Sequence, residues 1–303
     1  MKNNNILLES GTGELEVLKF KVKGVFYAIN VIKVKEILKT NLESIQPLPS
    51  QPKAVRGITN IRGEVITLID LREYLNQEIP YNANESELLV ILTEFNNIKL
   101  LFAVDQVIGI SRLKWSDIQK PNNLMGNLVN GIIKSDNQLV NFLDFESILT
   151  NIQPSMVMNT NNYKINSTLK EQRENITLAI ADDSPTIREI LKKTLYEAGY
   201  EDLKIFNDGQ QLLDYLYELK DKGAIVSNYI QGIITDIEMP EMDGHTLVKH
   251  IKNDKTLREI PTLIFSSLIT GDLRHKGDAV GVDEQISKPE IEKLINILDD
   301  LIL

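Results

Sequence analysis

Five polar residues in the second half of the chain have the types needed to bind a divalent cation and a phosphoryl group. In chain order they are Asp182, Asp183, Asp236, Ser266 and Lys288. Carboxylates brought together repel one another, by about 4 kcal/mol for a pair ~4 Å apart at an effective dielectric constant near 20. A divalent cation removes this repulsion, and a ligand set of oxygens alone favours Mg²⁺. A lysine ammonium and a hydroxyl donor beside the carboxylates form a suitable cradle for a transferred phosphoryl group.

The pattern around these residues predicts that strands and helices alternate and bring the five side chains together. The expected strands lie at 176–181, within 202–209, and at 232–236, 262–267 and 284–289. The first helix is expected to begin at Ser184, an N-cap residue followed by Pro185, and to end at Gly199. Further helices are expected at 211–219 and 291–303. Five β/α units predict a doubly wound parallel sheet, whose functional residues lie outside the carboxyl ends of the strands.

Taken singly, these residues have ordinary structural interpretations. Asp182 could cap a helix, Ser266 could be a turn residue and Lys288 could lie on the surface. The full set at the strand ends is much harder to obtain by chance. With DIEMPEMDG (236–244) and Lys288–Pro289, it resembles the receiver domain of response regulators over the whole of 176–303. This resemblance implies a flavodoxin-like α/β fold with a five-stranded parallel sheet.

The resemblance also implies the roles of the acidic residues. Asp236 would be the nucleophile that forms an acyl phosphate. Asp183 and Asp236 would ligate Mg²⁺ directly, and Asp182 would do so through water. Glu238 would contribute its backbone carbonyl to the same metal.

Two more roles and two departures follow from the same resemblance. Lys288 would pair with the phosphoryl group, and Ser266 would hydrogen-bond to it and move on activation. Glu238 adds a fourth carboxylate near the site and is expected to alter dephosphorylation. Gln285 stands where many receivers have an aromatic residue that rotates with the hydroxyl residue, which puts that part of the switch in doubt.

The first 150 residues carry β-strand patterns instead. Leu18, Phe20 and Val22 alternate with lysines, and VFYAINVIKV (25–34) is expected to pair with that strand. Further strands are expected at 88–95 and 98–110, with a turn at Asn96–Asn97. This half has no histidine, no nucleophile elbow and no glycine-rich phosphate loop, so we expect a binding surface here and no catalytic site.

An internal repeat organises this first half. Residues 55–75 align without gaps on residues 129–149, so that Gly57 matches Gly131 and Asp70 matches Asp144. Each copy reads as a strand, a polar turn, an apolar strand and an aspartate that leads into a short helix. The repeat predicts two similar β-subdomains that pack together as small barrels. The equivalent aspartates are expected to cap helices.

Three segments of this half resemble the CheW family of chemotaxis coupling proteins: KVKEIL (33–38), PLPSQP (47–52) and VRGITNIRGEVITLIDLR (55–72). The resemblance implies an all-β double small barrel that binds chemoreceptor tips and the CheA histidine kinase. It places Val34, Glu36 and Arg62 on segments associated with partner contact. Core packing for Val34, simple solvation for Glu36 and a hairpin corner for Arg62 are the structural alternatives.

Composition sets the remaining limits. The chain of 303 residues has no cysteine, which excludes disulfides, thiolate catalysis and iron–sulfur clusters. Its net charge of −10 is concentrated in 176–303, which argues against direct nucleic-acid binding. No apolar run is long enough for membrane insertion and the start does not resemble a secretion signal, so we expect a cytoplasmic protein. The three histidines, at 245, 250 and 275, are expected at solvated positions without a metal.

The expected organisation is a CheW-like coupling domain (1–150), a linker (151–175) and a receiver domain (176–303). This combination resembles the CheV family of chemotaxis proteins. It implies a scaffold that couples methyl-accepting chemoreceptors to a CheA-type histidine kinase, with phosphorylation of Asp236 modulating the coupling. The alternative is a phosphate sink that drains the kinase, with the first domain serving only for localisation. In neither case is the protein expected to be an enzyme beyond its own phosphoryl acceptance and hydrolysis.

Overall fold

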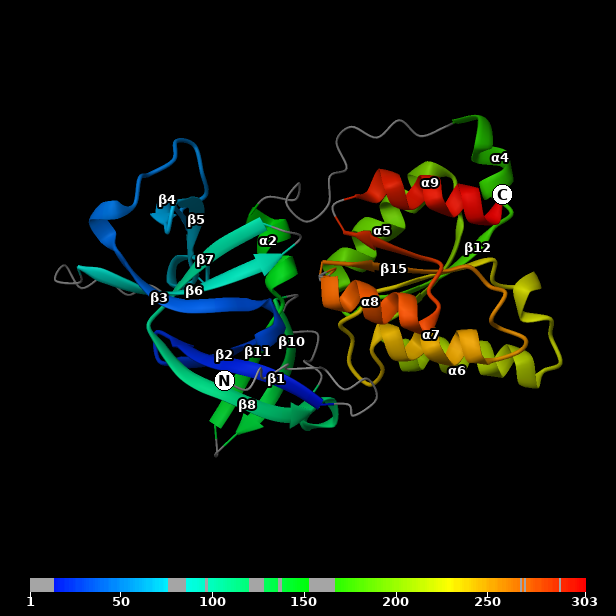
Figure 1. Ribbon diagram of the computed structural model, residues 1–303, viewed down its shortest axis with the longest axis horizontal. Helices are drawn as coiled ribbons and strands as arrows, with labels where there is room; N and C mark the ends of the chain where they lie inside the picture. The colour runs from blue at the N-terminus through cyan, green and yellow to red at the C-terminus, as the bar shows by residue number, and fades with distance from the viewer. Residues whose placement is uncertain are drawn as a thin grey trace. The chain divides into compact units, whose positions relative to one another are not determined.

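The computed structural model describes residues 14–75, 86–95, 98–119, 128–135, 138–152, 167–267, 269, 271–288 and 290–303 (Figure 1). The chain divides into two compact units, one formed by Glu14–Phe145 and the other containing Glu146–Leu303. Within the described residues, no helix is both long and apolar enough to cross a membrane.

The first unit is β-rich, as predicted, and contains two sheets. The six-stranded sheet has the order β8-β1-β2-β11-β10-β9, and the five-stranded sheet has the order β3-β6-β7-β5-β4. The strands are β1 (Glu14–Val22), β2 (Val25–Asn30), β3 (Val34–Asn41), β4 (Val55–Ile61), β5 (Glu64–Asp70), β6 (Glu87–Phe95), β7 (Ile98–Val104), β8 (Gln106–Lys114), β9 (Ile118–Gln119), β10 (Val129–Ser135) and β11 (Gln138–Leu143). Short 3₁₀ turns lie at Val31–Lys33, Leu42–Ser44 and Trp115–Asp117.

Two of the predicted strands are too long, because the chain changes sheet within each of them. The strand expected over 25–34 ends at Asn30, whose side-chain oxygen accepts a hydrogen bond from Ile32 N at 3.1 Å and caps a 3₁₀ turn. The strand expected over 98–110 is divided at Asp105 between β7 and β8, which belong to different sheets. The turn expected at Asn96–Asn97 lies outside the described residues.

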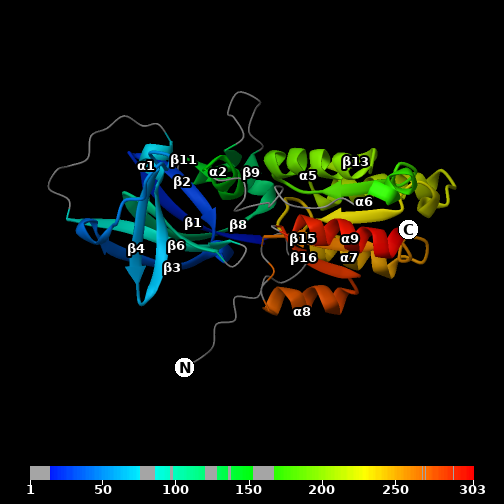
Figure 2. The same cartoon turned by 90° about the horizontal axis from the view of Figure 1, so that it is seen from above.

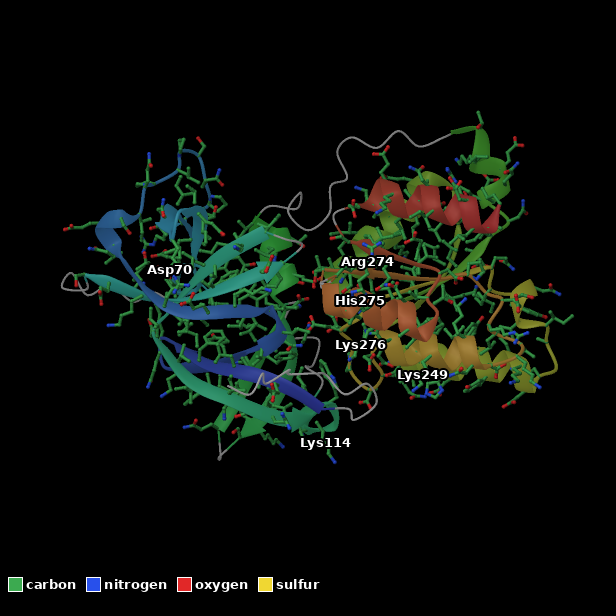
Figure 3. The ribbon with its side chains drawn as sticks, in the orientation of Figure 1. Asp70, Lys114, Lys249, Arg274, His275 and Lys276 are labelled. Carbon is green, nitrogen blue, oxygen red and sulfur yellow. The ribbon has the colours of Figure 1, made fainter. Side chains whose placement is uncertain are left out.

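The predicted repeat is present in the structure. The first copy forms β4, β5 and helix α1 (Leu71–Tyr74), and the second forms β10, β11 and helix α2 (Phe145–Ile152). Both hairpins are antiparallel and carry a register shift just before the aligned glycines, Gly57 and Gly131. Both second strands then pair in parallel with a further strand, β5 with β7 and β11 with β2. Asp70, labelled in Figure 3, caps α1 by accepting from Arg72 N, as expected.

The second unit is built on a parallel five-stranded sheet with the order β13-β12-β14-β15-β16, as predicted. Its strands are β12 (Thr177–Ala181), β13 (Asp202–Phe206), β14 (Gly232–Thr235), β15 (Thr262–Ser266) and β16 (Glu284–Ser287). Its helices are α4 (Lys170–Arg173), α5 (Pro185–Ala198), α6 (Gly209–Asp221), α7 (Gly244–Asn253), α8 (Gly271–Val280) and α9 (Ile291–Ile302), with 3₁₀ turns at Ser167–Leu169 and Val226–Asn228.

Helices cover both faces of this sheet. Figure 1 shows α5 and α9 over one face and α6, α7 and α8 over the other. Seen from above, α5 lies toward the β13 edge and α8 toward the β16 edge (Figure 2). Helix α5 begins and ends as predicted, because Ser184 caps its first turn and Gly199 takes a left-handed φ of 107° after its last residue. The strands therefore run between two layers of helices, and their carboxyl ends meet at one edge of the sheet.

Candidate phosphoacceptor and metal site

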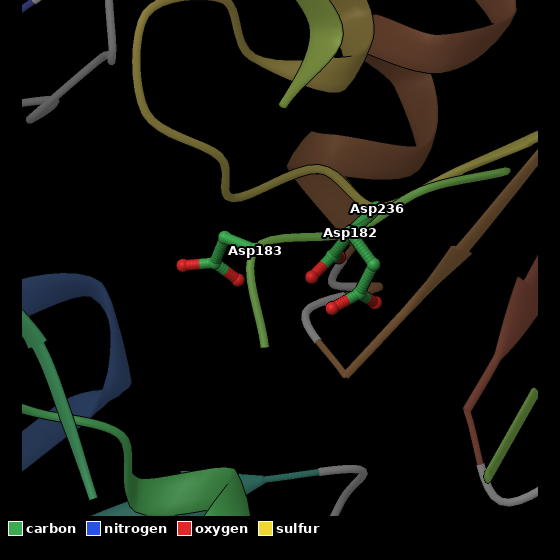
Figure 4. A group of neighbouring side chains, drawn as sticks. All are labelled: Asp182, Asp183 and Asp236. Atoms are coloured by element: carbon green, nitrogen blue, oxygen red, sulfur yellow. The ribbon is translucent and has the colours of Figure 1, made fainter. Parts of the chain in front are cut away.

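The topology of the sheet brings Asp182 and Asp236 together. Strands β12 and β14 are parallel neighbours with Ala181 opposite Thr235, and each aspartate follows its strand directly. Asp236 N also donates to Ala181 O at 2.9 Å, which holds the two loops in register. Ligand oxygens of Asp182, Asp183 and Asp236 lie within 4.8 Å of one another (Figure 4). Among the described residues, these three carboxylates form the acidic group of this edge.

Lys288 lies inside the acidic group. Its ammonium is 2.8 Å from Asp236 Oδ2 and 3.0 Å from Asp182 Oδ2, and its side chain is fully buried. Lys288 N donates to Ser266 O at 3.2 Å, which fixes the residue after the end of β16. Burial opposes the charged ammonium, but the surrounding carboxylates outweigh this effect and raise the pKa of Lys288 well above its ordinary value. The lysine is therefore a permanent positive charge at the site.

The surroundings of Asp182 suit a metal ligand. Its burial, with the nearby charges of Asp236 and Glu146, raises its pKa to about 7 although Lys288 acts in the opposite direction. Oδ1 accepts from Ser184 N at 2.9 Å, whereas the buried Oδ2 has no hydrogen-bond donor in suitable geometry within the described residues. An all-oxygen donor set with an unsatisfied buried carboxylate oxygen fits a divalent cation such as Mg²⁺.

The loop after β14 positions Asp236. Ile237 N donates to Asp236 Oδ1 at 2.6 Å, so that one carboxylate oxygen is held by the backbone and the other by Lys288. Gly244 N donates to Ile237 O at 3.0 Å, and a Cβ on Gly244 would lie 2.0 Å from Asp236 O. The glycine that begins α7 is thus required for close approach to the backbone of Asp236. The start of α7 therefore packs tightly against the backbone of Asp236, the candidate phosphoacceptor.

The other receiver residues singled out from the sequence lie near this edge in different ways. Ser266 is buried at the end of β15 and pairs with Ser287 on β16. Glu238 is half-buried on the loop two residues after Asp236 and is not a member of the group of three carboxylates. Gln285 is buried, and its Nε2 donates at 2.8 Å to Arg274 O and to Asp278 Oδ1 of helix α8. The residue at the expected aromatic position is therefore anchored to α8.

Sequence reasoning missed two residues of the site, Glu146 and Ser267. Glu146 Oε2 accepts from Lys288 Nζ at 2.9 Å, and Glu146 Oε1 accepts from Ser267 Oγ at 2.5 Å. The repeat carried a signal, because Glu146 aligns with Arg72, which in the first copy pairs with Asp70 at 3.0 Å. A reversed charge at equivalent buried positions indicated that the second helix has a different partner. The alignment could not indicate which one.

In the first unit, the structure brings two of the three expected partner-contact residues together. Arg62 Nη2 lies 2.7 Å from Glu36 Oε1, and Arg62 occupies the β4–β5 turn with a left-handed φ of 53°. It is therefore also the hairpin corner considered as the alternative. Val34 is half-buried at the start of β3, opposite Thr93 of β6.

One histidine prediction is wrong. His245 lies on the buried face of α7, and its Nε2 is 3.2 Å from Leu273 O, so it is not solvated. Its burial lowers the pKa of the imidazole below its ordinary value. His250 and His275 are exposed, as expected, and Figure 3 labels His275 on α8. Helical position alone does not show which face of α7 meets α8.

Comparison with known proteins gives two family matches and full-length relatives. Residues 16–153 match the CheW-like domain, and residues 178–299 match the response regulator receiver domain. The chain is 30% identical over 297 residues to chemotaxis protein CheV3 of Helicobacter pylori, covering 92% of each chain. It is 27% identical to CheV1 of the same organism, covering 91% of this chain and 89% of that one. The structure of the scaffolding protein TtCheW from Thermoanaerobacter tengcongensis is 23% identical, with a TM-score of 0.39 over 43% of this chain and 88% of that one.

Proposed function

Because this chain belongs to the CheV family of chemotaxis proteins, we propose that it couples chemoreceptors to a CheA-type histidine kinase and that phosphorylation of Asp236 modulates the coupling. The observation that carries the proposal is the position of the Lys288 ammonium, 2.8 Å from Asp236 Oδ2 and buried within an acidic group of a receiver unit. The CheW-like unit of the same chain supplies the coupling surface. With these two partners, the protein would act in the cytoplasm, at receptor arrays.

The proposed reaction is transfer of a phosphoryl group from a kinase phosphohistidine. A carboxylate oxygen of Asp236 attacks phosphorus in line, an oxygen–phosphorus bond forms, and the phosphorus–nitrogen bond breaks. The electron pair stays on the imidazole nitrogen, which takes a proton from solvent. Lys288 is positioned to neutralise charge on the phosphoryl oxygens, and the Ile237 N–H holds the other carboxylate oxygen in place.

Asp182, Asp183 and Asp236 would hold Mg²⁺ in this scheme. When bound, the metal supplies charge neutralisation at the transferred oxygens. The contribution of the protein itself is to hold these carboxylates at strand ends, with Asp182 and Asp236 buried and Asp183 half-buried. Phosphorylation then adds about −1.5 to −2 charges to a group that is already acidic. Such a change favours one receiver conformation over another, which is the basis for a switch.

The test is phosphotransfer from a CheA-type kinase that carries labelled phosphoryl, in the presence of Mg²⁺. Rapid label transfer to the full chain, absent in Asp236→Asn, is the expected result. A folded chain that takes no label would show that the receiver is inactive and that the proposal is wrong.

Switch and sink are separated by a second measurement on reconstituted arrays of receptor and kinase. A switch requires that Asp236→Asn alter the kinase activity set by receptor ligand at a fixed level of this protein. A sink instead requires fast label transfer with receptor–kinase coupling unchanged by the variant.

A further inference from the structure

Glu146 is a carboxylate placed against the phosphoryl-binding groups of the site. It lies in the first turn of α2, belongs to the same compact unit as the receiver strands, and is only 5% exposed. Its two carboxylate oxygens have different partners at the site. Oε2 accepts from the Lys288 ammonium at 2.9 Å, and Oε1 accepts from the Ser267 hydroxyl at 2.5 Å.

These partners are the kind that a phosphoryl group uses. An ammonium and a hydroxyl bind anionic oxygens through charge-assisted hydrogen bonds. The metal side of the site is different, because among the described residues the acidic group with ligand spacing contains Asp182, Asp183 and Asp236 and does not include Glu146. Glu146 therefore lies on the phosphoryl side of the site, where its carboxylate occupies donors that a phosphoryl group would use.

The ammonium of Lys288 is enclosed by carboxylates, and it donates hydrogen bonds to two of them, Asp236 and Glu146. It has three N–H donors, and three carboxylate oxygens lie within 3.0 Å of it, from Asp182, Asp236 and Glu146. Asp182 and Asp236 are held by their strand ends and by backbone donors, Ser184 N and Ile237 N. Glu146 is the partner contributed by a separate helix, far away in the sequence.

We propose that Glu146 is a built-in competitor of the phosphoryl group, which occupies Lys288 and Ser267 in the unphosphorylated protein and must leave when Asp236 is phosphorylated. The inference rests on the proposed function and adds a way in which the phosphorylation of Asp236 is regulated. An acyl phosphate on Asp236 would bring a dianion next to the Glu146 carboxylate in a buried site, and like charges there disfavour each other strongly. Phosphorylation thus expels the first turn of α2 from the site, and the energy needed for that expulsion lowers the reactivity of the receiver.

A purely structural role for Glu146 makes the opposite predictions. If the carboxylate served only to balance the charge of Lys288, its removal would loosen the site and weaken anion binding. Occupation of the site by a phosphoryl mimic would also leave α2 in place. Binding strength and the protection of α2 therefore distinguish the two roles.

The experiment uses the full chain, Mg²⁺ and beryllofluoride, a non-covalent phosphoryl mimic that binds to an aspartate carboxylate. Binding is followed by ¹⁹F NMR for the wild type, for Glu146→Gln and for Glu189→Gln, which changes an exposed glutamate of α5 as the matched control. Losing one charge-assisted hydrogen-bonded competitor is expected to tighten binding by about tenfold in Glu146→Gln. The control is expected to bind like the wild type. Thermal unfolding of the same samples verifies that each is folded.

A second measurement needs no substitution. Hydrogen exchange of the α2 amides in the wild type is expected to become faster when beryllofluoride saturates the site. Equal or weaker binding by Glu146→Gln, or unchanged exchange of α2 in the saturated wild type, would overturn the inference while leaving the proposed function intact. If neither the wild type nor Glu146→Gln binds the mimic, both the inference and the proposed function are wrong.

Discussion

Arg173 in helix α4 holds Asp299 of helix α9 through a two-pronged contact, with Nε 2.8 Å from Oδ1 and Nη2 2.5 Å from Oδ2. Arg173 is fully buried, and its Nη1 also donates to Ala198 O at 2.7 Å. The Tyr200 hydroxyl donates to Asp299 Oδ1 at 2.8 Å. A residue that precedes the first receiver strand is thus part of the core of the second unit.

This contact predicts the effect of Arg173→Ala. Removing the guanidinium leaves the Asp299 carboxylate poorly solvated and without its cation, which costs about 3–5 kcal/mol for a buried pair. Urea unfolding of the full chain should show the transition of the second unit at lower denaturant concentration. Arg258→Ala is the control, because Arg258 forms an exposed pair with Glu259 at 3.0 Å and should change stability by less than about 1 kcal/mol. Equal effects of the two variants would contradict this prediction.

A substitution at Gly244 should damage the phosphoacceptor loop through sterics alone. A Cβ there would lie 2.0 Å from Asp236 O, a distance that backbone atoms cannot accept without moving. Gly244→Ala should therefore reduce both stability and phosphotransfer to Asp236. The comparison is Gly223→Ala, where φ is 77° and nothing lies within 4 Å of the new Cβ, so a cost of about 1 kcal/mol and normal phosphotransfer are expected. Normal phosphotransfer in Gly244→Ala would show that the loop tolerates a shift.

Magnesium binding should depend on pH through Asp182. Its pKa is raised from 3.8 to about 7, first by burial, so the metal-free folded chain keeps a proton that the unfolded chain has released. The stability linked to this proton is fully present below about pH 3.8 and is lost as pH rises through about 7. Because a cation favours the ionised form, the apparent Mg²⁺ affinity should be about tenfold weaker near pH 6 than near pH 8.

Calorimetric titration with Mg²⁺ at the two pH values measures this change and the proton released on binding. Asp182→Asn should bind the metal more weakly at both values and lose most of the difference between them. An affinity that is the same near pH 6 and near pH 8 in the wild type would refute the role given to Asp182.

The exposed pair of Arg62 and Glu36 predicts a binding defect without a folding defect. The Arg62 side chain is 77% exposed, and an exposed ion pair contributes about 1 kcal/mol or less. Arg62→Glu should therefore leave unfolding nearly unchanged and weaken co-sedimentation with receptor and kinase arrays. Arg112→Glu is the matched control, since Arg112 is also exposed and lies 2.7 Å from Glu16. If both variants bind equally well, Arg62 is only the corner of its hairpin.

The internal repeat shows which features of the fold local sequence patterns can predict. The alignment of 55–75 with 129–149 predicted two hairpins, each followed by a helix, and the structure confirms both, including the matching register shifts. It did not predict that the strands expected over 25–34 and 98–110 would each be divided between two sheets. The apolar pattern continues across each break although burial does not. The residues of β2 and β7 are mostly buried, whereas Val34 is half-buried and Ile108 and Ile110 of β8 are exposed.

The sequence by itself determined where the chemistry of the receiver unit gathers. Asp182 and Asp236 each follow an apolar strand, Lys288 follows the short strand Glu284–Ser287, and in a parallel sheet all strands present their carboxyl ends at one edge. Their meeting thus depends on local strand patterns and on one rule of topology, both of which can be read along the chain.

Only the tertiary structure decided what else enters that edge. Glu146 and Lys288 are 142 positions apart, and no period or motif relates a helix at the end of the repeat to a strand end of the receiver. The burial of His245 against Leu273 and the contact of Arg173 with Asp299 were decided in the same way. Such contacts depend on how whole elements pack. One-dimensional patterns specify which face of an element is apolar, but they do not specify which distant side chain will lie against it.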